Sequence, residues 1–240
     1  MLKKNEIKLS IVIPCYNESN TIREIIKRAS YHLQKYNFNN FEIIVIDDCS
    51  NDGTTKILTE ISIENNIKVF FHKKNLGKGA AVHTGIKNSS GQILIIQDAD
   101  LEYDPSDYDK LLQPFFEADA DVVYGSRFIG GGKYVRIHFF WHYLANKIIT
   151  FVCNMFTNLN LTDVETGYKV FKTSCLESVS LKEKSFSFEP EITIKLAKKK
   201  FKFFEVPITY NGRSYSEGKK IGLKDAFIAF KAIFIYSITK

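Results

Sequence analysis

The sequence predicts an α/β fold, in which a mostly parallel sheet carries helices on both faces. Three observations lead to this prediction. Short apolar runs rich in β-branched residues recur along the chain, as strands buried on both faces require. These runs alternate with segments whose apolar residues follow helical spacing. Polar residues cluster directly after several of the runs, and ligands of such sheets bind beyond the carboxyl ends of the strands.

The first half of the chain alternates strands and helices regularly. The stretch "LSIVIPCYN" (9–17) predicts a buried strand, and segment 19–36 carries isoleucines at the spacing of an amphipathic helix. Further strands are predicted, in order, at 41–48, 67–71, 92–98 and 121–125. Further helices are predicted at 54–64, at 78–88, and from Pro105 to about 117.

The second half has a different character. A glycine-rich loop at 125–136 precedes an aromatic-rich amphipathic helix predicted over 137–158. The remaining predicted elements are a strand at 167–172, a helix at 189–199, a strand at 201–210 and a C-terminal helix from about 222. Because no repeat or low-complexity linker interrupts the chain, we expect a single domain over 1–240.

Composition limits the class of protein. The chain has 240 residues, 45% hydrophobic and 25% charged, which is typical of a globular protein and excludes a disordered or fibrous one. Its net charge of +6 suits phosphorylated ligands, an anionic membrane surface or nucleic acid. The four cysteines form no C-x-x-C motif, and neither a signal peptide nor a membrane-spanning stretch is recognisable. We therefore expect reduced thiols in a cytosolic setting.

An acidic cluster follows the predicted strand at 92–98. The stretch "LIIQDADLEYDP" places four acidic residues at alternate positions, Asp98, Asp100, Glu102 and Asp104. Like charges this close repel one another, and no Lys or Arg is adjacent in the sequence. A solvated loop is one interpretation, but a second diacid, Asp47-Asp48, also ends a predicted strand and favours a site. Carboxylates suit Mg²⁺ or Mn²⁺, which often bind through one or two of them together with substrate phosphates.

Other kinds of site fit the sequence poorly. Gly132-Lys133 lacks the remainder of a phosphate-binding Walker loop. No G-x-S-x-G motif indicates a serine hydrolase, and the five histidines are too scattered to indicate a zinc site.

Five stretches in a fixed order resemble the family 2 glycosyltransferases of GT-A fold: "SIVIPCYNES", "IIVIDDCSNDGT", "NLGKGAAVHTGI", "ILIIQDADLEYDP" and "VVYGSRF". The stretches "LTDVETGYKVFK" and "FEPEI" resemble, within that family, the dolichyl-phosphate mannose synthase group, which includes polyprenyl-phosphate glucosyltransferases. The resemblance implies a GT-A (Rossmann-like) fold. It also implies a nucleotide-sugar-binding half, 1–130, and an acceptor and membrane-interface half, 131–240.

Carried over residue by residue, the resemblance implies a donor site. The residues expected to bind the nucleotide sugar are Pro14, Tyr16, Asn17, Glu18, Asp47, Asp48, Lys78, Gly79, Asp98 and Lys220. The first four are expected under the base and ribose, and the Asp47-Asp48 pair is expected to include the acid that hydrogen-bonds the base. Mg²⁺ or Mn²⁺ is expected on Asp98, Asp100 and Glu102. Glu102 stands where many relatives carry Gln, and its extra charge bears on the choice of metal.

The resemblance also implies an acceptor site. Arg127, in "GSR", is expected to bind the acceptor phosphate, and Asp163 stands where relatives use an acid near the acceptor. Arg213 and Lys220 are expected to close on the donor diphosphate or the lipid phosphate. The predicted catalytic residues are therefore Asp100, Arg127, Asp163 and Arg213. Simpler interpretations stay open: a surface cation for Arg127, a turn cap for Asp163, and solvated loop positions for Arg213 and Lys220.

The reaction that these residues imply is an inverting, metal-dependent transfer of a hexose from a nucleotide sugar to a polyprenyl phosphate. Mannose from GDP-mannose is the first expectation and glucose from UDP-glucose the second. A phosphate nucleophile is already anionic near neutral pH and needs no strong base, whereas a glycan or glycolipid hydroxyl would need Asp163 or Glu191 as the base. An alternative of another class is a non-catalytic nucleotide-sugar-binding scaffold subunit.

A polyprenyl acceptor implies work at a membrane surface. The helix at 137–158 has an apolar stripe, Phe140, Leu144, Ile148, Phe151 and Met155. The C-terminal helix has another, Leu223, Phe227, Phe230, Phe234 and Ile238. Aromatic amphipathic helices lie in the interface, although such stripes more often form core. We expect the 137–158 helix on lipid, peripheral attachment to the cytoplasmic face or a separate membrane-anchored partner, and no nucleic-acid partner.

Overall fold

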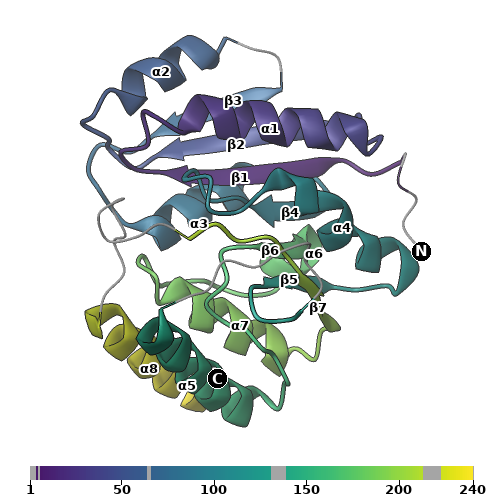
Figure 1. The fold of residues 1–240 in the computed structure, drawn as a ribbon, viewed down its shortest axis with the longest axis vertical. Helices are drawn as coiled ribbons and strands as arrows, with labels where there is room; N and C mark the ends of the chain where they lie inside the picture. The colour runs from purple at the N-terminus through teal and green to yellow at the C-terminus, as the bar shows by residue number, and fades with distance from the viewer. Residues whose placement is uncertain (1–3, 5, 64–65, 131–138, 213–222, 240) are drawn as a thin grey trace.

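The structure, a computed structural model, describes the chain except residues 1–3, 5, 64–65, 131–138, 213–222 and 240. A seven-stranded sheet in the order β3-β2-β1-β4-β6-β5-β7 runs through the molecule (Figure 1). The strands are β1 (Leu9–Cys15), β2 (Phe41–Asp47), β3 (Ile67–Phe71), β4 (Ile93–Ile96), β5 (Val122–Ser126), β6 (Lys169–Lys172) and β7 (Phe203–Pro207). The sheet joins strands from both halves of the sequence.

The described helices lie between these strands, except for α8, which follows the last one. They are α1 (Ile22–Lys35), α2 (Thr54–Ile61), α3 (Lys78–Asn88), the 3₁₀ turn η1 (Pro105–Asp107), α4 (Tyr108–Glu117), α5 (Phe140–Thr157), α6 (Thr173–Glu177), α7 (Phe188–Lys198) and α8 (Leu223–Ile238). The predicted fold class is confirmed, with element ends moved by a few residues. The short helix α6 was not predicted, because five residues carry too little periodicity to be recognised.

Alternation along β1 explains the two layers of helices. Ile11 and Ile13 belong to one buried cluster with α1 and α4, whereas Val12 belongs to a second with α3 and α7. Successive side chains of a strand point to opposite faces, so an uninterrupted apolar run is buried on both. The apolar strands predicted from sequence are central for this reason.

One strand breaks the parallel pattern. β6 is antiparallel to both of its neighbours, β4 and β5, while the other pairs in the sheet are parallel. The residues before β6, Asp163 to Tyr168, therefore come to the edge of the sheet at which β4 and β5 end. This reversal brings a turn of the second half beside the acidic cluster of the first.

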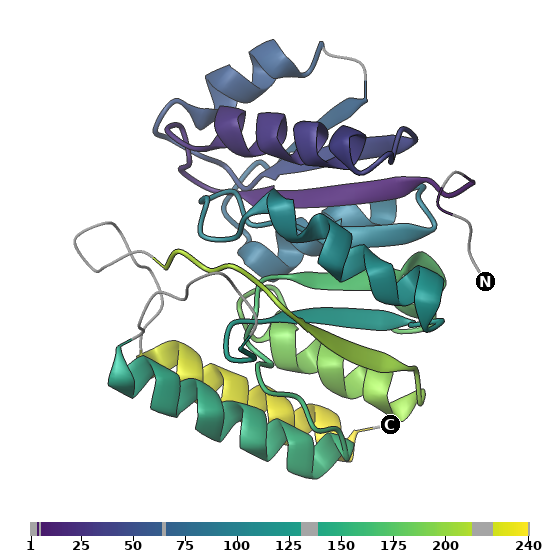
Figure 2. The ribbon, with the colours of Figure 1, turned by 45° about the vertical axis from the view of Figure 1, so that its right-hand side comes forward.

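The helices α5 and α8 form an outer layer on α7 rather than covering the sheet. They lie side by side in both ribbon views (Figure 2), and the ring centroids of Phe156 and Phe234 are 6.3 Å apart. Small or buried residues such as Cys153, Ala229 and Ala232 face the interior. Most of the large apolar side chains of the predicted stripes are exposed, so the interpretation of these stripes as core is wrong for both helices.

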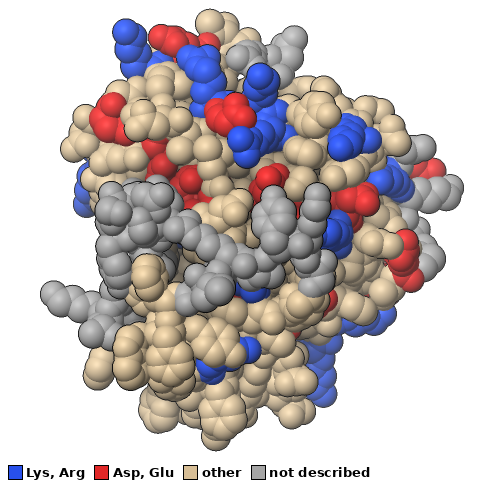
Figure 3. All heavy atoms as spheres, viewed as in Figure 1, with Lys and Arg blue, Asp and Glu red and all other residues tan. Residues whose placement is uncertain are grey.

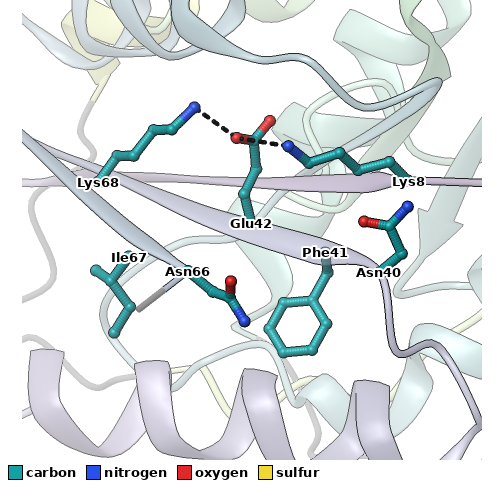
Figure 4. Close-up of a pocket in the computed structure, with 7 residues that line it drawn as sticks. All are labelled: Lys8, Asn40, Phe41, Glu42, Asn66, Ile67 and Lys68. Carbon is teal, nitrogen blue, oxygen red and sulfur yellow. Dashed lines mark hydrogen bonds and ion pairs between the residues drawn. The ribbon is translucent and has the colours of Figure 1, made fainter. Parts of the chain in front are cut away.

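A buried carboxylate links neighbouring strands at the amino-terminal end of the parallel strands, opposite the end where the acidic cluster lies. Glu42, on β2, is 3% exposed and lies between Lys8 and Lys68 (Figure 4), with N–O distances of 3.3 Å and 2.7 Å. Ser10 and Ser90 also donate hydrogen bonds to it. Burial raises the pKa of Glu42, but the hydrogen bonds from Lys68, Ser10 and Ser90 outweigh burial and lower it to about 2.

Replacing Glu42 with Gln is expected to destabilise the fold by about 3 kcal/mol at neutral pH, the value of a pKa held about 2.5 units below normal. Because the folded pKa is the lower one, this stability is present above pH 4.5 and is lost as the pH falls towards 2. Urea unfolding at pH 7 and pH 3 measures it. The exposed Arg23–Glu60 pair provides the control, since Glu60→Gln should change stability by less than about 1 kcal/mol. Equal effects of the two substitutions would contradict the prediction.

Candidate active site

The first two strands end in loops that hold each other. After β1, the Asn17 side-chain oxygen accepts a hydrogen bond from the Asn51 N–H, and the Asn17 N–H donates to Ser50 Oγ. The Glu18 N–H likewise donates to Thr54 Oγ1. The predicted base-binding residues Pro14, Tyr16, Asn17 and Glu18 therefore lie on one preformed rim with the loop after β2.

The diacid at the end of β2 serves the protein itself. Asp47 accepts hydrogen bonds from the Ser50 N–H and Thr55 Oγ1. Asp48 accepts from the N–H groups of Leu76 and Gly77 and pairs with His72 Nδ1 at 2.7 Å. Both carboxylates are buried, and they fix the loops on either side of the rim. The predicted bond from this pair to a nucleotide base stays a prediction.

The acidic cluster after β4 has a counter-ion that is distant in sequence. Lys78, the first residue of α3, places its Nζ 2.8 Å from Asp98 Oδ1 and 3.3 Å from Glu189 Oε1. Burial alone would lower the pKa of Lys78, but Asp98 and Glu189 raise it above its ordinary value. The sequence indicated no cation beside Asp98, and the structure corrects this, because residues far apart along the chain meet at the sheet edge.

Gly79 is placed by packing. A Cβ on Gly79 would lie 2.4 Å from the Glu183 carbonyl oxygen, and the next N–H, of Ala80, donates to the Lys184 carbonyl at 3.2 Å. The loop before α7 therefore covers the start of α3 and holds Lys78 beside Asp98. This close approach explains on packing grounds alone why residue 79 is a glycine. The predicted contact of Gly79 with a nucleotide is a separate matter.

The three predicted metal ligands behave differently. Asp98 packs closely against Gly167, where a Cβ would lie only 2.3 Å from Asp98 Oδ2. Asp100 Oδ1 accepts from the Glu102 N–H, and the Glu102 carboxylate accepts from the Tyr210 hydroxyl at 2.6 Å. Within the described residues, no three acidic, His or Cys side chains gather closely enough to hold a metal ion.

These carboxylates therefore fit a divalent cation held by one or two protein oxygens and completed by substrate phosphates, which is how Mg²⁺ commonly binds. They do not form a complete three-carboxylate cage. Asp98 and Asp100 stay predicted ligands, and Glu102 is tied to Tyr210 in this structure.

A buried ion pair joins the two residues that are predicted to lie beside the acceptor, Arg127 and Asp163. Arg127 Nε and Nη2 each lie 2.7 Å from an oxygen of Asp163, which is fully buried. Asn146, on α5, donates a further hydrogen bond to Asp163. Burial raises the pKa of Asp163, but Arg127 outweighs it and holds the pKa below its usual range. Asp163 thus positions Arg127, whose guanidinium also lies 5.2 Å from the ring of Tyr210.

A turn connects the two sides. Gly167 lies against Asp98, and four residues earlier Asp163 holds Arg127. Lys169, fully buried, donates to the carbonyls of Val164 and Thr166 and pairs with Glu189. Tyr103 accepts a hydrogen bond from the Gly167 N–H and lies between the acidic cluster and Arg127.

Sequence reasoning missed several of these residues. Asn146 and Glu189, which are not among the residues predicted for the site, are both buried in it. Lys169 was not considered, although a lysine inside an apolar strand, "YKVF", is a signal of a buried partner. The predicted residues Arg213 and Lys220 lie outside the described part of the chain.

Comparison with known proteins identifies the family. The sequence model described as "Glycosyl transferase family 2" matches residues 10–180. The chain belongs to this family. It is 31% identical to dolichol-phosphate mannosyltransferase of Pyrococcus furiosus over 217 residues, which are 90% of this chain and 60% of that protein. It thus spans less than two thirds of the length of that relative.

Two further relatives match more of their own length. UDP-N-acetylglucosamine–dolichyl-phosphate N-acetylglucosaminyltransferase of Methanococcus voltae is 29% identical, with 96% of each chain covered. Polyprenol monophosphomannose synthase of Mycolicibacterium smegmatis is 26% identical, with 88% of this chain and 80% of that protein covered.

Solved structures support the fold. Glucosyl-3-phosphoglycerate synthase from Mycobacterium tuberculosis, in complex with Mn²⁺, UDP and phosphoglyceric acid, has a TM-score of 0.72 at 18% identity, covering 99% of this chain and 81% of that one. Mannosyl-3-phosphoglycerate synthase from Rubrobacter xylanophilus has a TM-score of 0.70 at 19% identity, covering 95% and 73%. The glycosyltransferase fold expected from the motifs, GT-A, is confirmed.

Glu165 gives this site a pH-dependent stability. Its Oε1 is buried and has no hydrogen-bond partner among the described residues. Burial, and then Glu189, raise the pKa of Glu165 to about 7, against the lowering effect of Lys169 and Arg127. Around the turn 163–167, the negative charges of Glu165, Asp163 and Glu189 therefore outweigh the positive charges of Lys169 and Arg127.

The wild-type protein is expected to become less stable as the pH rises from 4.5 to 7. Glu165→Gln is expected to abolish this pH dependence. The folded pKa is the higher one, so the folded state holds its proton more tightly and stability falls over that window, by up to about 3 kcal/mol. Urea unfolding at pH 5 and pH 8 measures the difference, with Glu177→Gln on the exposed side of α6 as the control. The same pH dependence in wild type and Glu165→Gln would contradict the assignment.

Proposed function

We propose that the protein transfers a hexose, with inversion, from a nucleotide sugar to a polyprenyl phosphate at a membrane surface. GDP-mannose is the first donor expected and UDP-glucose the second. The observation that carries the proposal is the turn 163–167, which sets Arg127 through Asp163 at one end and lies against Asp98 at the other. A phosphate-binding cation beside a predicted donor site suits a phosphate acceptor. The names of the relatives agree with this acceptor class.

The residues divide the chemistry between them. Arg127 is charged at every physiological pH and keeps N–H groups beyond the two on Asp163, so it can hold an acceptor phosphate. A phosphate monoester with a second pKa of about 6 is already nucleophilic, so no side chain needs to take its proton. Mg²⁺ or Mn²⁺ on Asp98 and Asp100 would stabilise the negative charge on the departing nucleoside diphosphate. In-line attack then inverts the sugar carbon.

The outer helices support a membrane location. Trp141, Phe151 and Met155 on α5 are 74%, 64% and 67% exposed, and Phe227 on α8 is 83% exposed. The surface in the lower part of Figure 3, over these helices, is largely uncharged. No helix in the described residues combines the length and hydrophobicity needed to cross a bilayer. We propose that this face lies in the interface, as apolar amphipathic helices do.

The side of the membrane is inferred from cysteine chemistry. None of the four cysteines forms a disulfide bond, which suits a reducing compartment, and we therefore propose the cytoplasmic face. The exposed apolar faces of α5 and α8 would let the protein attach to the membrane without a partner. A separate membrane-anchored partner is therefore a further proposal that this attachment does not require.

Transfer of radiolabelled sugar to a short polyprenyl phosphate is the decisive assay. Wild type with GDP-mannose and Mg²⁺ or Mn²⁺ should give organic-phase product, abolished by EDTA and reduced on the order of 100-fold or more in Asp100→Ala, as for loss of a group stabilising transition-state charge. Asp109→Asn, at an exposed position on α4, should keep full activity. UDP-glucose is run in parallel, and UDP-N-acetylglucosamine because of the Methanococcus relative.

The outcomes separate the parts of the proposal. Product from a different donor would correct the sugar and keep the acceptor. Donor hydrolysis without labelled lipid would overturn the polyprenyl phosphate and favour a hydroxyl acceptor. Binding of a donor with neither hydrolysis nor transfer would favour the non-catalytic nucleotide-sugar-binding scaffold subunit.

Trp141 reports membrane contact directly, because it is the single tryptophan of the chain. Anionic liposomes should shift its fluorescence to shorter wavelength, and lipids brominated near the headgroup should quench it. Phe151→Ser combined with Phe227→Ser should weaken flotation with the liposomes by at least about 10-fold, given roughly 1.5–3 kcal/mol for each buried Phe. Ile63→Ser, exposed on the opposite part of the molecule, is the control. Unchanged Trp141 emission with liposomes would count against the membrane face.

A further inference from the structure

The ammonium group of Lys78 forms an ion pair with Asp98, the carboxylate that is predicted to bind a metal ion. Its Nζ is 2.8 Å from Asp98 Oδ1 and 3.1 Å from Oδ2, so the ammonium lies across both oxygens. Lys78 is also the first residue of α3, where the helix dipole disfavours a cation. The ammonium therefore stays there because of the carboxylates that surround it.

A second carboxylate is already within reach of the same ammonium. Glu189 Oε1 lies 3.3 Å from Lys78 Nζ, and both side chains are largely buried, at 16% and 4% exposure. Glu189 also pairs with Lys169, which holds the carbonyls of the 163–167 turn. Asp98, Lys78, Glu189 and Lys169 thus form a row of alternating charges with no net charge, in which Glu189 and Lys169 are buried and Asp98 and Lys78 partly buried.

A divalent cation and an ammonium repel each other, and they compete for Asp98 because the ammonium lies within hydrogen-bond distance of both of its oxygens. We propose that Lys78 is a resident counter-ion, which neutralises Asp98 until a divalent cation binds there and then transfers its ion pair to Glu189. The proposal rests on the predicted metal site at Asp98. Glu189 makes the displacement possible, because the ammonium keeps a buried anionic partner throughout the exchange.

The first test measures Mn²⁺ binding to the full chain by electron paramagnetic resonance, with GDP and, in parallel, UDP present in excess, because substrate phosphates are expected to complete the site. Lys78→Met removes the competing cation, so Mn²⁺ should bind at least about 10-fold more tightly than in wild type, a change equivalent to about 1.4 kcal/mol. Lys87→Met, an exposed position at the other end of α3, should bind Mn²⁺ as wild type does. Circular dichroism confirms that each variant is folded.

The second test has the opposite sign. Glu189→Gln leaves Lys78 without its alternative anion, so Mn²⁺ should bind at least about 10-fold more weakly than in wild type. In the double variant Lys78→Met, Glu189→Gln, this weakening should largely disappear, because no ammonium remains to be transferred. A double-mutant cycle isolates this coupling between the two side chains.

Each outcome decides the proposal. Tighter binding in Lys78→Met together with loss of the Glu189→Gln effect in the double variant supports it. Equal weakening by Glu189→Gln with and without Lys78 would show only direct attraction between Glu189 and the metal, and would overturn the transfer. Unchanged binding in Lys78→Met would overturn the counter-ion role while leaving the metal site. Failure of every variant and of wild type to bind Mn²⁺ would overturn both. If Lys78→Met does not fold, Lys78→Gln replaces it.

Discussion

Four buried or partly buried side chains of alternating charge, Asp98, Lys78, Glu189 and Lys169, join parts of the chain that the sheet brings to one end. Charges can be buried only when they are paired, and here each carboxylate lies between two cations or beside one. Removal of any one member leaves the row with a net charge, which is costly where the charges are sheltered from water. The loop before α7, the start of α3 and the turn before β6 all take their positions from it.

The reversal of β6 explains why this row can exist. A strand antiparallel to β4 delivers the turn 163–167 directly to the carboxyl end of β4, where Asp98 follows. The same turn sets Arg127 through Asp163, which α5 supports from outside through Asn146. The helix α5, which has an exposed apolar face, is therefore also in contact with the Arg127–Asp163 ion pair. In the proposed reaction, one helix would face the lipid and help to position its phosphate.

The fold was predictable because burial on both faces forces strands into apolar, β-branched runs, which can be recognised without knowledge of their neighbours. The candidate site was predictable only in part. Asp98 and Arg127 follow strands directly, and the position alone indicates them. Glu189 and Asn146 lie on helices, where an acid near the N-terminus or a single amide has ordinary explanations, so their burial could be learned only from packing.

The sequence alone determined the alternation of strands and helices, the polar positions at the strand ends, and the motifs of the glycosyltransferase family. It did so because these depend on local periodicity and short spacing. Only the tertiary structure decided that Lys78 neutralises Asp98, that Asp163 is bound to Arg127, and that the apolar stripes of α5 and α8 face outwards. Each of these depends on contacts between residues far apart in the chain, for which a linear pattern holds no signal.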